Sequence, residues 1–140
     1  NRKWFDDTIL DHDKLSIRDS GTIVMVDLNK FKEINDTYGH IVGDKVLIHV
    51  TVKLKECGGR VVRYGGDEFI IIFDSKISTI EIEEKMENIL RYFEKIHFKV
   101  DDSSFKISFA YGMAPFTRGA DMSRVIEAAD KSMYKHKKRQ

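Results

Sequence analysis

Residues 60–73 read Arg-Val-Val-Arg-Tyr-Gly-Gly-Asp-Glu-Phe-Ile-Ile-Ile-Phe, and this stretch predicts an apolar β-hairpin. Residues 61–62 and 69–73 are β-branched or aromatic, which is typical of strands. Between them, Gly65 and Gly66 predict a tight turn with positive φ, and they leave no side chain to block a ligand. The sequence therefore places bare backbone at the tip of an apolar hairpin.

Two carboxylates, Asp67 and Glu68, follow the glycines directly. Anions beside bare backbone indicate a metal or a phosphate-bearing ligand at the turn. A further carboxylate, Asp27, ends the apolar run 22–28, which predicts a buried central strand. If the two strands are neighbours, Asp27 and Asp67 converge at one sheet end, and their repulsion favours a cation such as Mg²⁺ between them. The alternative is that Asp27 caps the helical turn that begins after Asn29.

Composition is that of an ordinary soluble protein. The 140 residues are 41% hydrophobic and 34% charged, which predicts one domain over residues 1–140. The formal net charge of +1 gives no global signal for nucleic acid or a membrane surface. The single cysteine, Cys57, fits a reducing compartment, and no apolar run approaches the roughly 20 residues of a membrane helix. We expect a cytoplasmic domain, slightly truncated at both ends, whose full-length protein can carry a membrane anchor.

Hydrophobic periodicity predicts the order of helices and strands. Helices are expected at 2–12, 30–36 (a short turn), 43–57, 78–93 and 121–137, and strands at 22–28, in the hairpin 60–73, at 98–100 and at 105–111. Pro115 is expected to end the last strand, and Tyr134 to lie on the inner face of the last helix. The order predicts an α/β (α+β) sandwich whose central, mostly antiparallel five-stranded sheet is flanked by helices.

Groups suited to a nucleotide follow the central strand. Lys30, Phe31 and Lys32 open the helical turn, where free backbone N–H groups and Lys32 suit phosphates. The alternative is a solvated lysine pair. Asn35 and Asp44 match the edge of guanine, because a carboxylate accepts from N1–H and N2–H₂ and an amide both donates and accepts. The alternative for these two residues is helix capping.

Longer motifs occur in a fixed order along the chain. They are Val-Asp-Leu-Asn-Lys-Phe-Lys-Glu-Ile-Asn-Asp-Thr-Tyr-Gly-His at 26–40 with Gly-Asp at 43–44, Arg-Tyr-Gly-Gly-Asp-Glu-Phe at 63–69, and Ala-Asp-Lys-Ser-Met-Tyr-Lys-His-Lys at 129–137. Together they resemble the GGDEF diguanylate cyclase family, and residues 107–112 lie where that family has its S-x-G strand. The resemblance covers the whole chain and implies the palm-like fold of nucleotidyl cyclases.

The resemblance implies that two GTP molecules condense into cyclic di-GMP, a bacterial second messenger, with release of pyrophosphate. Each protomer supplies one half-site, so the implied partner is a second copy of the chain and not a nucleic acid. By position, Asp27 and Asp67 would bind Mg²⁺ (or Mn²⁺) through their carboxylates, and Leu28 through its carbonyl. Asp67 and Glu68 form the catalytic acidic tip, in which Glu68 is a ligand or a supporting base.

Substrate contacts are implied in the same way. They are Lys30, Phe31, Lys32 and Lys137 for the β- and γ-phosphates, Asn35 and Asp44 for guanine, and Gly65 and Gly66 for the ribose-phosphate. Many members of the family have a second Asp where this chain has Asn29, so we expect modulation of activity there. An upstream regulatory or sensor domain outside these residues is also implied. The alternative functions are a catalytically silent module that binds GTP and a protein-interaction scaffold.

Overall fold

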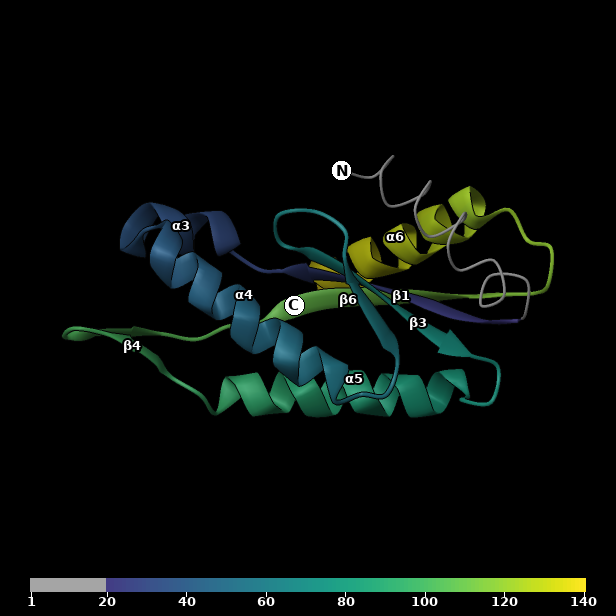
Figure 1. Cartoon of the computed structure of the whole chain (residues 1–140), viewed down its shortest axis with the longest axis horizontal. Coiled ribbons are helices and arrows are strands. Elements are labelled where there is room, and N and C mark those ends of the chain that lie inside the picture. The colour runs from purple at the N-terminus through teal and green to yellow at the C-terminus, as the bar shows by residue number, and fades with distance from the viewer. Residues whose placement is uncertain (1–19) are drawn as a thin grey trace.

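The computed structural model describes residues 20–140. These residues fold into an antiparallel sheet with helices on both faces (Figure 1). The elements are β1 (Gly21–Leu28), α3 (Phe31–Tyr38), α4 (His40–Lys55), β2 (Arg60–Arg63), β3 (Glu68–Asp74), α5 (Thr79–Glu94), β4 (Phe98–Val100), β5 (Ser103–Phe105), β6 (Phe109–Phe116) and α6 (Met122–Arg139). None of the described helices is both long and apolar enough to cross a bilayer.

The strand β1 lies inside a four-stranded sheet of order β2-β3-β1-β6, in which every neighbouring pair is antiparallel. Its run of apolar residues is nearly continuous because both faces of the strand are covered. In the ladder, Asp27 pairs with Glu68 of β3 and with Ala110 of β6. The carboxyl end of β1 therefore lies beside the start of β3.

Each face of the sheet has its own core, because successive side chains of β1 point to opposite faces. Val24 and Val26 pack with side chains of α3, α4 and α5, whereas Ile23 and Met25 pack with side chains of α6. Figure 1 shows α5 on one side of the sheet and α6 on the other. The polar end of β1 is thus fixed between two apolar layers.

The predicted fold class is confirmed, with a smaller main sheet than expected. Four strands form the main sheet within residues 20–140, because β4 and β5 make a separate two-stranded sheet. The expected strand at 105–111 is wrong, since β5 ends at Phe105 and β6 begins at Phe109. Stacking explains the break: the Phe105 ring lies 4.7 Å from that of Tyr38 and 5.5 Å from that of Phe98, which holds the small hairpin beside α3.

Smaller details also differ from the expected ones. The helix α4 starts at His40, before the expected start, because Gly39 at φ 92° separates it from α3. Pro115 lies inside β6, on an outer strand of the described sheet, where a missing N–H removes no ladder bond. Tyr134 is 59% exposed, so it does not belong to the inner face of α6. The helix predicted at 2–12 lies outside the described residues.

Candidate functional site

The end of β1 and the turn before β3 bring two carboxylates to one end of the sheet. The Leu28 N–H donates to the Asp67 carbonyl at 3.0 Å, which fixes the two backbones side by side. Asp27 and Asp67 are both half-buried. Asp27 does not cap α3, because the N-cap position is Lys30 and no side chain caps that helix. The convergence expected from the sequence is therefore present in the structure.

Repulsion between the two carboxylates disfavours their both being ionised. Burial raises the pKa of Asp67, and the charge of Asp27 raises it further, whereas a backbone hydrogen bond, Lys137 and Arg63 lower it. Lys137 Nζ lies 3.2 Å from Asp27 Oδ2 and neutralises part of the charge. A cation at this end of the sheet would relieve the remaining repulsion.

The donor set fits a hard divalent cation with an open coordination shell. Asp27 and Asp67 offer carboxylate oxygens, and Leu28 offers the last carbonyl of β1, all of which suit Mg²⁺. No cluster of three or more His, Cys, Asp or Glu side chains able to hold a metal occurs within residues 20–140. The protein would thus supply few ligands, and phosphate oxygens and water would complete the shell, as Mg²⁺ usually requires.

The glycine turn differs from its predicted conformation. The glycines with positive φ within residues 20–140 are Gly39, Gly58 and Gly119, so the expected positive φ at Gly65 and Gly66 is wrong. The connection spans residues 64–67 and does not need the left-handed conformation of a two-residue turn. Arg63 holds it instead: Nε donates to the Gly65 carbonyl at 3.1 Å and Nη2 to the Gly66 carbonyl at 2.7 Å. A Cβ added at Gly66 would meet nothing within 4 Å, so the tip is open.

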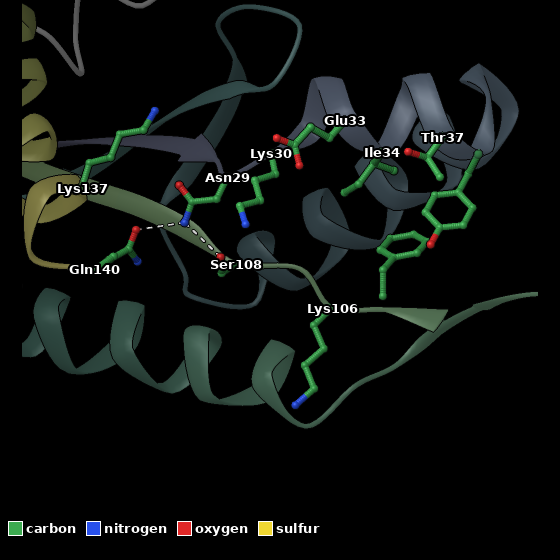
Figure 2. Close-up of a pocket in the computed structure, with 11 residues that line it drawn as sticks. Asn29, Lys30, Glu33, Ile34, Thr37, Lys106, Ser108, Lys137 and Gln140 are labelled. Atoms are coloured by element: carbon green, nitrogen blue, oxygen red, sulfur yellow. Dashed lines mark hydrogen bonds between the residues drawn. The ribbon is translucent and has the colours of Figure 1, made fainter. Parts of the chain in front are cut away.

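A basic cavity of about 730 Å³ lies next to the carboxyl end of β1 (Figure 2). Three lysines, Lys30, Lys106 and Lys137, line it together with one acidic residue, Glu33. Lys30 has φ 58° and ψ 24°, a left-handed conformation that turns the chain from β1 into α3. In Figure 2 the Lys106 side chain extends away from Asn29. A cavity with this lining suits an anionic ligand such as a phosphate group.

Asn29 joins three segments at the mouth of this cavity. Its Nδ2 donates to Ser108 Oγ and to Gln140 Oε1, both at 2.9 Å (Figure 2). Gln140 Nε2 in turn donates to the Phe109 carbonyl at 2.9 Å. An aspartate at this position would have no N–H to donate, so the amide ties the end of β1 to α6 in a way that the acid would not.

The two predicted guanine contacts lie on adjacent helices. Asn35 Oδ1 is buried and has no hydrogen-bond partner among residues 20–140. A Cβ at Gly43 of α4 would lie 1.9 Å from this oxygen, so only glycine leaves room for the amide. Asp44 is exposed and lines a different cavity, of about 470 Å³, together with Leu47, Thr51 and Arg63. Neither Asn35 nor Asp44 caps a helix, because the N-cap positions are Lys30 and Gly39.

The predicted phosphate contacts divide into two groups. Lys30 and Lys137 line the basic cavity, whereas Lys32 is exposed on α3 and Phe31 is buried in the core. Neither Lys32 nor Phe31 lines that cavity. Glu68 is half-buried in the first position of β3.

Three residues that support the site were missed at the level of sequence. Arg63 belongs to the motif at 63–69, and a cation two residues before Gly65 is a signal for carbonyl binding. Ser108 and Gln140 carried no such signal, because they lie 79 and 111 residues from Asn29 in the chain. Only the fold brings them together.

Known proteins match this chain over its length. The sequence profile of the family described as "Diguanylate cyclase, GGDEF domain" matches residues 1–140. Two curated relatives from Escherichia coli K12 are 36% identical: the probable diguanylate cyclase DgcI over 98% of this chain and 29% of its own length, and the diguanylate cyclase DosC over 84% and 26%. The chain thus spans less than a third of either relative.

A solved structure agrees with the sequence comparisons. The GGDEF domain of DgcB from Caulobacter crescentus, in complex with c-di-GMP, is 28% identical, with a TM-score of 0.81 over 99% of this chain and 85% of that one. The fold and the three sequence motifs point to the same group of proteins, and the chain belongs to the GGDEF domain family of diguanylate cyclases.

Proposed function

We propose that this chain is an active diguanylate cyclase domain, which condenses two GTP molecules into cyclic di-GMP and releases pyrophosphate. The observation that carries the proposal is the meeting of Asp27 and Asp67 beside a basic cavity. The names of the curated relatives support the same reaction class. Residues 1–140 would form the single domain that carries this activity.

Mg²⁺ is the proposed cofactor, and Mn²⁺ would suit the same oxygen ligands. Asp27, Asp67 and the Leu28 carbonyl would hold the ion, which when bound would offset charge on the phosphate oxygens. Glu68 completes the acidic tip, as a further ligand or as a base for the attacking hydroxyl. The raised pKa of Asp67 supports this assignment, because a bound cation would favour its ionised form.

The triphosphate would lie along the basic cavity. Lys137 pairs with Asp27 and would turn to the β- and γ-phosphates when GTP binds. Lys30 lines the same cavity, and Lys32 with the backbone at Phe31 would approach the phosphates from the start of α3. These cationic groups would stabilise the leaving pyrophosphate.

The base and sugar would lie on the other side of the acidic tip. Asp44 would accept from N1–H and N2–H₂ of guanine, and the unpartnered Asn35 Oδ1 is proposed as a second acceptor. Gly65 and Gly66 would let the ribose-phosphate approach the backbone, since Arg63 holds their carbonyls and a Cβ at Gly66 would meet open space.

One domain would bind one GTP, so a second copy of the chain is the proposed partner. The attacking 3′-hydroxyl of each GTP would have to lie in line with the α-phosphate held by the other copy. An upstream regulatory domain outside these residues would bring the two copies together. The short share of the relatives' length that this chain spans is in keeping with such an arrangement.

The test is to incubate the protein, joined as a dimer by a fused coiled coil, with GTP and Mg²⁺ and to detect cyclic di-GMP by chromatography. We expect product from the wild type and none from Asp27→Asn or Asp67→Asn. A dimer that binds GTP and forms no product would contradict the cyclase proposal and would identify a catalytically silent GTP-binding module. A dimer that binds no GTP would contradict both GTP-dependent functions and would favour the third alternative, a protein-interaction scaffold.

A further inference from the structure

Two polar side chains of α6 and that of the residue that follows the helix contact the backbone of β6. The Tyr111 N–H donates to His136 Nδ1 at 3.0 Å, the Met113 N–H donates to Ser132 Oγ at 3.2 Å, and the Gln140 side chain donates to the Phe109 carbonyl at 2.9 Å. We call these three bonds the polar ladder. Its helix positions are four residues apart, and its strand positions are two apart.

The spacing of the polar ladder follows from the geometry of the two elements. Four residues of an α-helix rise about 6 Å, and two residues of a strand rise about 6.6 Å, so the two sets of positions stay aligned over several steps. Within residues 20–140, β6 pairs with β1 on one side only, and alternate residues of β6 have backbone groups that β1 does not bind. The polar ladder satisfies three of these groups, the N–H of Tyr111 and of Met113 and the carbonyl of Phe109.

A glycine allows the helix to come this close. A Cβ at Gly112 would lie 1.9 Å from the Met133 backbone nitrogen and 2.4 Å from the Ser132 carbonyl carbon. The backbone of α6 therefore rests directly on β6 at Gly112, between the rungs made by Tyr111 and Met113. Short side chains such as Ser132 reach the strand only because of this approach.

We propose that Ser132, His136 and Gln140 are positioning residues, which set the register of α6 on β6 and thereby hold Lys137 at Asp27. Lys137 is the neighbour of His136 in the last turns of α6, where its Nζ lies 3.2 Å from Asp27 Oδ2. A shift of one helical residue would turn Lys137 about a quarter of a turn away from the basic cavity. The inference rests on the proposed function for its catalytic meaning, whereas the polar ladder itself can be tested without turnover.

The His136 rung is enclosed by groups from every element packed against it. Glu83 and Glu87 of α5, Tyr111 of β6 and Arg139 of α6 line a cavity of about 360 Å³ with the imidazole. The Tyr111 hydroxyl donates to Glu87 Oε2 at 2.7 Å, and the Tyr111 ring lies 4.5 Å from that of His136. To accept from Tyr111, His136 must be neutral and carry its proton on Nε2.

The experiment compares His136→Leu, which removes the acceptor, with His136→Asn, whose Oδ1 replaces Nδ1 as an acceptor. Tyr134→Leu, on the exposed side of the same helix, is the control. Amide exchange by NMR is measured at Tyr111, together with the affinity for inorganic pyrophosphate and the KM and kcat for GTP. In His136→Leu we expect about tenfold faster exchange at Tyr111, which is the equivalent of one lost hydrogen bond. In the same variant the affinity for pyrophosphate should fall severalfold, and the KM for GTP should rise by a similar factor. His136→Asn should restore the pyrophosphate affinity and the KM to values near those of the wild type.

Each outcome decides the inference. Unchanged exchange at Tyr111 in His136→Leu would overturn the polar ladder, and faster exchange with unchanged pyrophosphate affinity would overturn the positioning role. If His136→Leu fails to fold, Ser132→Ala against Ser132→Thr repeats the comparison at the Met113 amide. A wild type joined as a dimer that makes no cyclic di-GMP would contradict the proposed function alone, because exchange and pyrophosphate binding do not depend on turnover.

Discussion

Asp67 is an acid whose ionised form is disfavoured by its surroundings in the fold. Burial and the neighbouring Asp27 raise its pKa above the ordinary value of 3.8. A raised pKa means that the folded state binds the proton more tightly than the unfolded state. This group therefore contributes stability below pH 3.8, and that contribution is lost as the pH rises through the folded pKa. A cation beside Asp67 would favour the ionised form and so lower this pKa.

The first prediction concerns Asp67→Asn. In metal-free buffer at neutral pH we expect an unchanged or higher Tm, with a gain in unfolding free energy of about 1 kcal/mol or less, because the repulsion is removed. Mg²⁺ should raise the Tm of the wild type and not that of the variant, since only the wild type binds the ion. Calorimetry with and without Mg²⁺ checks both points. A large loss of stability would show that Asp67 is a structural carboxylate.

The second prediction concerns Asp44→Ser. If the Asp44 carboxylate accepts from guanine, its loss should reduce the preference for GTP over ATP by about 10- to 100-fold, the value of charged hydrogen bonds. Competition binding with the two nucleotides measures this ratio. Asp36→Ser, an exposed acid on α3, is the matched control and should leave the ratio unchanged. Equal selectivity in wild type and Asp44→Ser would exclude Asp44 from the base pocket.

Residues of the site could be predicted where local chemistry reveals them. Asp27 ends an apolar run, and Asp67 follows two glycines, so each carboxylate stands out in the sequence. The conformation of Gly65 and Gly66 could not be predicted, because it depends on Arg63, which donates to both of their carbonyls. The connection is therefore longer than the two-residue turn with positive φ that the sequence predicts. The partners of Asn29 could not be found either, since Ser108 and Gln140 are distant in the chain.

At the scale of elements, the contact of α6 with β6 depends on a single missing methyl group. The third prediction is that Gly112→Ala lowers the unfolding free energy by about 3 kcal/mol or more, because its Cβ would overlap backbone atoms of α6 that cannot move independently. Gly66→Ala is the control, since its Cβ would meet open space and its φ is not positive. Denaturant unfolding measures both, and equal losses would contradict the close approach.

The fourth prediction is that the protein loses stability on acidification because of His136. The pKa of His136 lies below 6.5, and burial is the largest cause. Glu87 opposes this shift, Arg139 adds to it, and Glu83 opposes it. A lowered pKa means that the unfolded chain binds the proton more tightly, so the contribution of this group is complete above pH 6.5 and is lost as the pH falls through the folded pKa.

The measurement is the Tm of wild type and His136→Asn between about pH 8 and pH 5, the range in which histidine titrates. We expect the wild type to lose more stability on acidification than the variant, whose amide keeps an acceptor without titrating. Parallel curves for the two proteins would contradict a neutral His136 in the polar ladder.

Elements with strong periodicity could be predicted, and those set by tertiary contacts could not. The stripe of apolar residues in α5 and its Ser78 cap, which accepts from the Glu81 N–H, are local signals. The hairpin of β4 and β5 is not local, because stacking on Tyr38 draws Phe105 away from the main sheet. The sequence predicts that Pro115 ends a strand, although on an outer strand it interrupts no pairing.

At the scale of the whole molecule, the proposed site is half of a catalytic unit. The fifth prediction is that the rate per protomer rises with protein concentration and then saturates, because product forms only where two GTP-bound copies meet. Fusion to a dimeric coiled coil should remove this dependence. The assay is cyclic di-GMP formation over a dilution series, with light scattering to follow the association state. A constant rate per protomer in dilute, monomeric samples would contradict the shared site.

The polar ladder also determines how the sheet meets its surroundings. Sheet margins with free N–H and C=O groups recruit strands from other chains, which leads to runaway stacking and aggregation. In residues 20–140, one margin is β6, where His136, Ser132 and Gln140 occupy backbone groups that an incoming strand would need. The opposite margin, β2, is only four residues long and carries two exposed arginines. Both margins of the described sheet are therefore poor templates for an added strand, which disfavours pairing of copies edge to edge.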